Sequence, residues 1–190
     1  GRKYFELKNQ NVLVLCPKKL RDNWTIYKVN DQLNPFNKDR FRYDVLSHTD
    51  LSRDGGYSGD INLETIYWGN YDLVVIDESH NFRNDTKGRR NEEGEVVRKS
   101  RYERLMEDIV RAGIRTKVLM LSATPVNTNL RDLRNQIYFA TEGKDDAFSD
   151  AMGINSLKDT IADSQRRFTL WADPKKNPQR NVKDLLEQLP

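Results

Sequence analysis

Four short apolar runs occupy the first two-thirds of this 190-residue chain and limit the folds that it can adopt. Three of them are continuous, whereas the run at 43–47 alternates more between apolar and polar residues. Continuous apolar strands are typical of a parallel sheet, because helices cover both faces of such a sheet and bury every side chain. The predicted strands are Val12–Cys16, Tyr43–Ser47, Leu73–Ile76 and Val118–Leu121.

The segments between these runs carry apolar residues at helical spacing. Helices are predicted at 17–27, 102–113 and 130–137, where apolar residues recur at intervals of three and four. Pro17 suits a first helical turn, and Gly113 suits a helix end. Because strand and helix alternate, the sequence predicts an α/β domain with a mostly parallel sheet and helices on both faces.

Three segments lack this alternation. Residues 52–60 are rich in Gly and Ser, and residues 83–101 are dense in charge with little to bury, so both are predicted to be loops, the second one mobile. Periodicity weakens after residue 140, although apolar residues from 157 to 168 are spaced as in a helix. We therefore expect residues 141–190 to form a helical C-terminal extension.

Composition argues against several other classes of protein. Cys16 is the only cysteine, so no internal disulfide forms, and a cytoplasmic protein is the simplest interpretation. Together with His48 and His80 it gives no zinc-site pattern. The longest apolar runs hold about five residues, far short of the ~20 that span a membrane. The formal charge of +3 is too small to indicate nucleic-acid binding by itself.

Two adjacent carboxylates follow the third apolar run. Asp77 and Glu78 are predicted at the carboxyl end of a buried strand, where open α/β sheets bind their ligands. Asp77 suits a Mg²⁺ site reached through water, and Glu78 suits the orientation of an attacking water. An alternative is that the pair caps a following helix, since acidic residues are favoured there. His80 alone would be an ordinary hydrogen-bonding residue.

The sequence Asp77-Glu78-Ser79-His80 resembles motif II, the Walker B element of the DEAD/DEAH group of helicase superfamily 2. The resemblance implies catalytic roles for Asp77, Glu78 and His80. About forty residues later, Ser122-Ala123-Thr124 resembles motif III, which in that family couples the ATP site to the nucleic-acid side.

Further segments resemble the chromatin-remodeller-like (Swi/Snf-type) branch of the superfamily. Residues 12–24, with the sequence VLVLCPKKLRDNW, are similar to motif Ia, and residues 45–49 stand where motif Ib would. The branch is also matched at 81–84 and 126–127, so the resemblance covers roughly residues 10–140. Serine at 79 and at 122 departs from the branch's usual residues, and this departure favours a bacterial or phage-like source.

The resemblance implies a RecA-like fold of the P-loop NTPase type and a parent enzyme that uses ATP and Mg²⁺ to move on nucleic acid. No phosphate loop of the form GxxxxGK[ST] is present: of ten glycines, Gly143 alone precedes a lysine, and Asp145 takes the Ser/Thr place. In the family this loop precedes motif Ia. We therefore expect residues 1–190 to be a fragment of the first motor domain, without the phosphate-loop strand and without the second RecA-like domain, and inactive alone.

The family's sheet order gives a further expectation. It places the phosphate-loop strand beside the motif III strand. Without that neighbour, the strand at 118–121 should lie at an exposed edge while the other strands stay contiguous. An exposed edge pairs readily with another chain, so we expect self-association of the fragment.

Nucleic-acid contacts are expected at the two predicted strand ends that precede motif II. At the first, Pro17, Lys18 and Lys19 open the helix after the motif Ia strand, where backbone N–H groups and cations attract phosphate; Arg21 is a weaker candidate. At the second, Ser47 and Thr49 stand in the motif Ib position. Nothing indicates base-specific contacts, so binding through the backbone of duplex DNA is predicted.

Two other functions are open. A non-catalytic scaffold that binds nucleic acid or protein would keep the fold, but it would not need the acidic pair or Ser122-Ala123-Thr124. A metal-dependent nuclease using Asp77 and Glu78 would need a second acidic cluster with a nearby lysine, and none stands at another predicted strand end.

Overall fold

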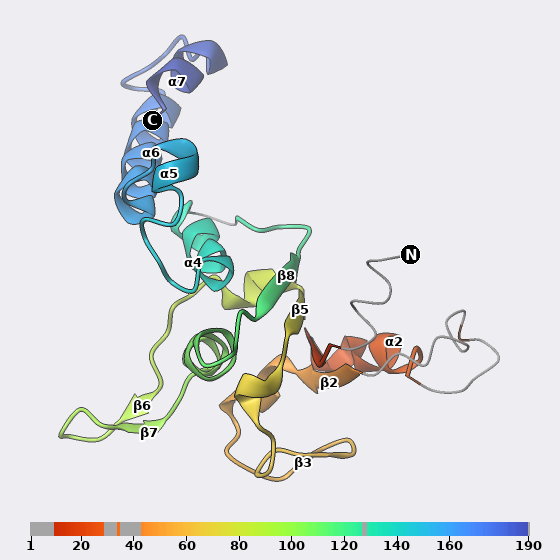
Figure 1. Cartoon of the computed structure of the whole chain (residues 1–190). Coiled ribbons are helices and arrows are strands. Elements are labelled where there is room, and N and C mark those ends of the chain that lie inside the picture. The colour runs from red at the N-terminus through yellow and green to blue at the C-terminus, as the bar shows by residue number, and fades with distance from the viewer. Residues whose placement is uncertain (1–9, 29–33, 35–42, 127–128, 190) are drawn as a thin grey trace. The chain divides into compact units, whose positions relative to one another are not determined.

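The computed structural model divides into two compact units, with the boundary between Ala123 and Thr124 (Figure 1). The first unit holds a parallel sheet and the second is helical. Among the described residues, no helix has both the length and the apolar character to cross a membrane. The described residues are 10–28, 34, 43–126 and 129–189.

Within these described residues, the sheet of the first unit has four strands that all run parallel. Each strand coincides with a predicted apolar run, to within one residue at either end. The prediction of an α/β fold with a parallel sheet is therefore confirmed. In spatial order the strands are β2 (Tyr43–Ser47), β1 (Val12–Cys16), β5 (Leu73–Asp77) and β8 (Lys117–Leu121).

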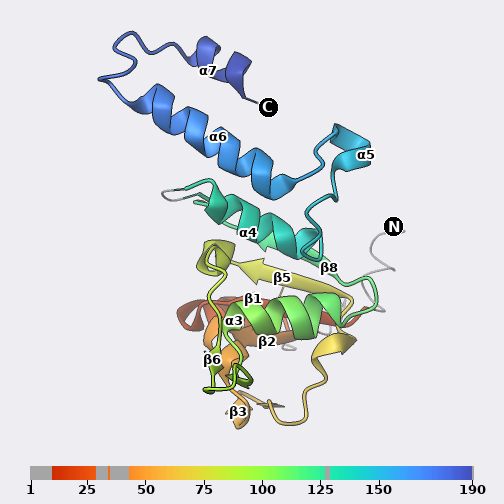
Figure 2. The ribbon, with the colours of Figure 1, turned by 90° about the vertical axis from the view of Figure 1, so that its left-hand side faces the viewer.

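Helices cover both faces of this sheet. On one face, Trp24 of the short helix α2 (Arg21–Thr25) packs against a cluster of buried strand residues. Helix α3 (Arg101–Glu103) and its continuation η6 (Arg104–Arg111) lie on the opposite side of the strands from α2 (Figures 1 and 2). The cluster under Trp24 consists of Val14, Cys16, Val45 and Val75.

The long helix at 101–111 confirms the predicted helix but has an unforeseen winding. After one α-helical turn it continues as a π-helix, in which the turns are wider. The wide turns bury two adjacent pairs of apolar residues, Leu105 with Met106 and Ile109 with Val110. The helix ends before Gly113, where a Cβ atom would lie 1.8 Å from Thr116 Oγ1, so only glycine fits there.

Strand β8 lies at the edge of the sheet, next to β5, and the other three strands are contiguous. This confirms the expected position of the strand. Its side chains are less covered than those of the inner strands, with Leu119 49 % and Leu121 37 % exposed. Among the described residues no strand pairs with the outer edge of β8, which lies beside apolar side chains, and self-association through this edge stays a prediction.

The shorter elements of this unit lie in the connections between strands. The predicted loop at 52–60 is wrong in part, because residues 57 and 58 pair with 61 and 62 in a small hairpin. The predicted helix after Pro17 begins as a 3-10 turn that leads into α2. These elements are η1 (Lys18–Leu20), η3 (His48–Ser52), β3 (Tyr57–Ser58), β4 (Ile61–Asn62), η4 (Trp68–Asn70) and η5 (Ser79–Phe82).

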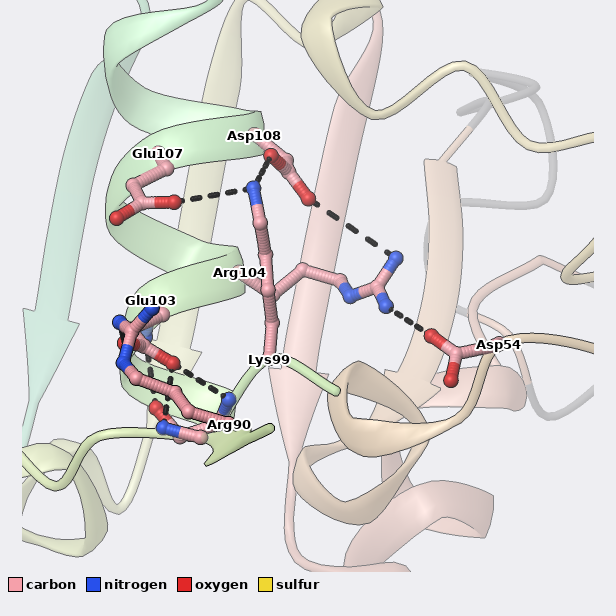
Figure 3. Close-up of polar contacts among 9 residues, drawn as sticks. Asp54, Arg90, Lys99, Glu103, Arg104, Glu107 and Asp108 are labelled. Atoms are coloured by element: carbon pink, nitrogen blue, oxygen red, sulfur yellow. Dashed lines mark hydrogen bonds and ion pairs between the residues drawn. The ribbon is translucent and has the colours of Figure 1, made fainter. Parts of the chain in front are cut away.

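The prediction of a loop at 83–101 is wrong in part. An antiparallel hairpin forms there from β6 (Arg89–Arg90) and β7 (Val96–Arg98). Its anchor is the carboxylate of Glu103, which accepts hydrogen bonds from Gly88 N at 2.6 Å and Arg90 Nη2 at 2.7 Å. The same carboxylate accepts a hydrogen bond from Ser100 N, and Ser100 Oγ accepts one from Glu103 N in return. Glu103 therefore contacts both the start of the helix and the hairpin (Figure 3).

Further ion pairs surround this anchor. Lys99 Nζ lies 2.5 Å from Asp108 Oδ1, and Arg104 Nη2 lies 2.6 Å from Asp54 Oδ1 (Figure 3). Burial favours the neutral form of Glu103, but hydrogen bonds from Ser100 N and Gly88 N and the charge of Arg90 outweigh it and lower its pKa. The ion pair of Arg90 with Glu103 and the hydrogen bond from Gly88 N to Glu103 therefore join the hairpin to the helix.

We expect Glu103→Ala to lower the free energy of unfolding by about 1–3 kcal/mol, because it removes a cap and leaves two amides without their acceptor. Urea denaturation measures the loss, and faster hydrogen exchange at Gly88 would locate it. Glu107→Ala is the matched control. It removes an exposed partner of Lys99 on the same helix and should cost less than about 1 kcal/mol. Equal losses in both variants would contradict this account of the anchor.

The described residues of the second unit form four helices. Asp145 joins the end of the first to the start of the third, since it accepts from Tyr138 Oη at 2.7 Å, Ser156 Oγ at 2.6 Å and Lys158 N at 2.8 Å. Gly143 has a φ of 76° after the first helix and serves as its end, not as part of a phosphate loop. The helices are α4 (Arg131–Ala140), α5 (Ser149–Met152), α6 (Leu157–Ala172) and α7 (Val182–Gln188).

Candidate functional site

The parallel sheet brings the carboxyl ends of its strands to one edge. Cys16 pairs with Ser47 in register, and Asp77 pairs with Leu121. The segments that follow these residues are those singled out from the sequence. The described structure therefore gathers Lys18 and Lys19, Thr49, the acidic pair and Ser122 at the same sheet edge, where open α/β sheets bind ligands.

Asp77 is the last residue of β5, and its side chain is hydrogen-bonded to the indole of Trp24. Trp24 Nε1 donates a hydrogen bond to Asp77 Oδ2 over 2.9 Å. The bond involves Oδ2, and no hydrogen bond to Oδ1 is found among the described residues, so Oδ1 is a candidate ligand atom. The sequence predicts a helix at 17–27 that includes Trp24, but it gives no sign of this contact, because 53 residues separate Trp24 from Asp77.

Glu78 has a left-handed backbone conformation, with φ 52° and ψ 51°. Such a conformation costs a residue other than glycine about 1–2 kcal/mol, so the surrounding turn has to hold it. Asn81 contributes to this, since its Nδ2 donates to the carbonyl oxygen of Glu78 over 2.9 Å. The side chain of Glu78 makes no capping hydrogen bond to η5, which speaks against the alternative that it only caps a helix.

His80 connects the acidic pair to the segment after β8. Its Nδ1 lies 3.1 Å from Glu78 Oε2 and 3.2 Å from Ser122 Oγ. One imidazole nitrogen is thus within hydrogen-bonding distance of both groups. Ala123 is exposed beside Ser122, and Thr124 is the first residue of the second compact unit.

His48 is a second histidine at this edge, and sequence analysis gave it no role. Its side chain is 4 % exposed, lies edge-on to Phe82 with ring centroids 4.9 Å apart, and leaves Nε2 without a hydrogen-bond partner among the described residues. Burial lowers the pKa of His48 to about 4, and the charge of Arg101 adds to this. His48 is therefore neutral at physiological pH, and its ring packs against Phe82 of η5.

The candidate nucleic-acid residues differ in accessibility. Lys18 and Lys19 are exposed on η1, just after Pro17, which stands at its N-cap position. Thr49 is exposed as well.

Two other candidates have structural contacts. Ser47 is buried and belongs to a capping box with Asp50 at the start of η3. Arg21 donates to Ser58 Oγ at 2.6 Å and to Ser58 O at 2.8 Å, so its guanidinium ties α2 to the β3–β4 hairpin.

The candidate cation ligand at this sheet edge is the carboxylate of Asp77. No group of three or more His, Cys, Asp or Glu side chains gathers within the described part of the chain. Asp77 supplies a carboxylate oxygen, Oδ1, that Trp24 does not bind, and such an oxygen suits Mg²⁺, a cation that keeps several waters and shares its shell with phosphates. Asp77 is thus the residue that would hold Mg²⁺.

No protein-family model matches the chain, and no curated protein matches it. The functional assignment below therefore rests on the motifs, their placement at one sheet edge and the contacts among them.

Proposed function

We propose that residues 10–140 are part of the first RecA-like motor domain of a superfamily 2 enzyme that couples ATP hydrolysis to movement on nucleic acid. The observation that carries the proposal is the position of His80 Nδ1, within 3.2 Å of both Glu78 Oε2 and Ser122 Oγ. His80 therefore connects the acidic motif to the Ser-Ala-Thr segment. A motor needs such a connection if ATP hydrolysis at the acidic motif is to change the conformation of the Ser-Ala-Thr segment.

Each residue of the acidic motif has a role in this proposal. Bound Mg²⁺·ATP would supply the phosphoryl group and the charge that polarises it. Asp77, whose carboxylate accepts a hydrogen bond from Trp24, would hold the cation, in part through water. Glu78 would accept a hydrogen bond from the attacking water, orient it and take up its proton as a general base, and its contact with His80 keeps the carboxylate in place.

The phosphate loop of such a motor has to come from outside these 190 residues, because they contain no GxxxxGK[ST] segment. The open edge of β8 supports this part of the proposal. A further parallel strand paired there would cover Leu119 and Leu121 and would end at the same sheet edge as Asp77. The loop after that strand would then face the acidic pair.

Nucleic acid is proposed to bind through its phosphates at Lys18, Lys19 and Thr49, which are exposed at the same edge. Ser47 contributes by fixing the start of η3 rather than by contact. Duplex DNA is the proposed substrate.

We predict that ATP hydrolysis by a longer polypeptide carrying the phosphate loop is stimulated by duplex DNA.

The double substitution Lys18→Ala with Lys19→Ala should weaken DNA binding. It should also reduce, by about 2, the magnitude of the slope of log K for DNA binding against the logarithm of the salt concentration, because roughly one counterion is released per phosphate contact. Lys158→Ala with Lys175→Ala, two exposed lysines of the second unit, is the control with the same change in charge. An unchanged slope in the first variant would overturn the assignment of these contacts.

A further inference from the structure

Trp24 occupies a position that packing alone does not explain. Its ring covers the apolar cluster on one face of the sheet, and at the same time its indole N–H reaches the carboxylate at the end of β5. A phenylalanine would fill much of the same space without the N–H group. Apolar packing therefore does not explain why the residue here carries an N–H group that donates to Asp77.

The backbone that carries Trp24 is fixed on both sides. Tyr43 Oη donates to the carbonyl oxygen of Trp24, and Arg21, one helical turn earlier, is bound to Ser58 by two hydrogen bonds. The indole has little freedom to follow a moving carboxylate. We therefore expect the hydrogen bond from Trp24 to set the orientation of the Asp77 carboxylate. The side-chain torsions of Asp77 adjust to the indole.

We propose that Trp24 is a positioning residue for the metal-holding carboxylate: its indole N–H restrains Asp77 Oδ2 and presents the other oxygen to a hydrated divalent cation. The cation's assignment to Asp77 rests on the proposed function. The contact also joins the helix that follows Lys18 and Lys19 to the acidic motif. A phosphate bound at η1 and a cation bound at Asp77 are thus linked through one side chain.

The first test observes the indole directly in the 190-residue chain. Trp24, Trp68 and Trp171 are the only tryptophans, so ¹⁵N labelling gives three indole N–H signals. The Trp24 signal should shift in Asp77→Asn, and substoichiometric Mn²⁺ should broaden it selectively in the unchanged chain, because paramagnetic broadening detects weak binding nearby. The signals of Trp68 and Trp171 serve as internal controls. Loss of the selective broadening in Asp77→Asn supports the proposal.

The second test measures affinity. Trp24→Phe keeps an aromatic ring on the apolar cluster but removes the donor, and we expect Mn²⁺ to bind about 10-fold more weakly, as for other residues that orient a metal ligand. Trp68→Phe should leave the affinity unchanged. In the Asp77→Asn background, Trp24→Phe should have no further effect, because the two residues act as one unit. A purely structural role would instead change the unfolding midpoint and leave Mn²⁺ affinity as it was.

The outcomes separate this proposal from the proposed function. Unchanged Mn²⁺ affinity in Trp24→Phe, or a Trp24 signal insensitive to both Asp77→Asn and Mn²⁺, overturns the positioning role even if the longer polypeptide hydrolyses ATP. Selective broadening with weaker binding in Trp24→Phe upholds it even if no ATP hydrolysis is found, in which case the proposed function alone fails. If Trp24→Phe does not fold, the comparison of Asp77→Asn with the unchanged chain still decides.

Discussion

Replacing Glu78 with glutamine should reduce ATP hydrolysis by a polypeptide that carries both this chain and a phosphate loop by roughly 100-fold or more, the usual contribution of a residue that takes a proton from the attacking group. Glutamine keeps the size of the side chain and can still lie near His80, but it cannot act as a base. Binding of Mg²⁺ and ATP should change little, because Asp77 is untouched. Steady-state hydrolysis and nucleotide affinity, measured on the same samples, separate the two effects.

A matched control is available in the hairpin. Glu93→Gln makes the same chemical change at an exposed residue between β6 and β7, away from the strand ends that form the site. It should leave the hydrolysis rate unchanged within a factor of about two, as expected for a surface substitution. If Glu78→Gln hydrolyses ATP as fast as Glu93→Gln does, Glu78 does not orient the attacking water and the role assigned to it is wrong.

Stability should fall steeply with acid because of His48. Its pKa is about 4 in the folded chain, against about 6.5 for a histidine in an unfolded one. Between these values the unfolded chain binds a proton that the folded chain does not, so the free energy of unfolding decreases as pH falls from 6.5 towards 4. From pH 7 to pH 4.5 the loss attributable to His48 is about 2–3 kcal/mol.

Two variants isolate this effect from the carboxylates that titrate in the same range. His48→Leu cannot take up a proton and keeps an apolar side chain among the buried residues, so its stability should depend on pH by about 2–3 kcal/mol less. His80→Gln removes the only other histidine and should retain the full dependence. Urea denaturation at pH 7 and pH 4.5 gives the comparison. Identical pH dependence in His48→Leu and the unchanged chain would show that His48 is not buried as a neutral residue.

The sheet was predictable because its signal is local. A continuous apolar run such as Leu73–Ile76 is buried whatever lies next to it, and five or fewer residues are enough to define the strand. The position of β8 at the edge followed from the resemblance to a helicase family rather than from the residues of the strand. The short helix after Pro17 and the long one ending near Gly113 were also visible as periodic patterns.

The features that were missed depend on contacts between distant residues. Strand β6 has only two residues and β7 only three, and both are polar or exposed, so no periodicity marks them. Their pairing depends on Glu103, which binds a backbone amide 15 residues away. The bond from Trp24 to Asp77 spans 53 residues. Such polar contacts leave no pattern in a single sequence, whereas apolar strands do.

Binding of a non-hydrolysable ATP analogue in the presence of Mg²⁺, measured by calorimetry, tests the central claim most directly. The 190-residue chain should show no binding, a longer polypeptide with a phosphate loop upstream of residue 1 should bind, and Asp77→Asn in the longer polypeptide should bind more weakly. Binding by the 190-residue chain alone would contradict the proposed place of the phosphate site. Binding by neither polypeptide would contradict the motor assignment and favour a non-catalytic scaffold.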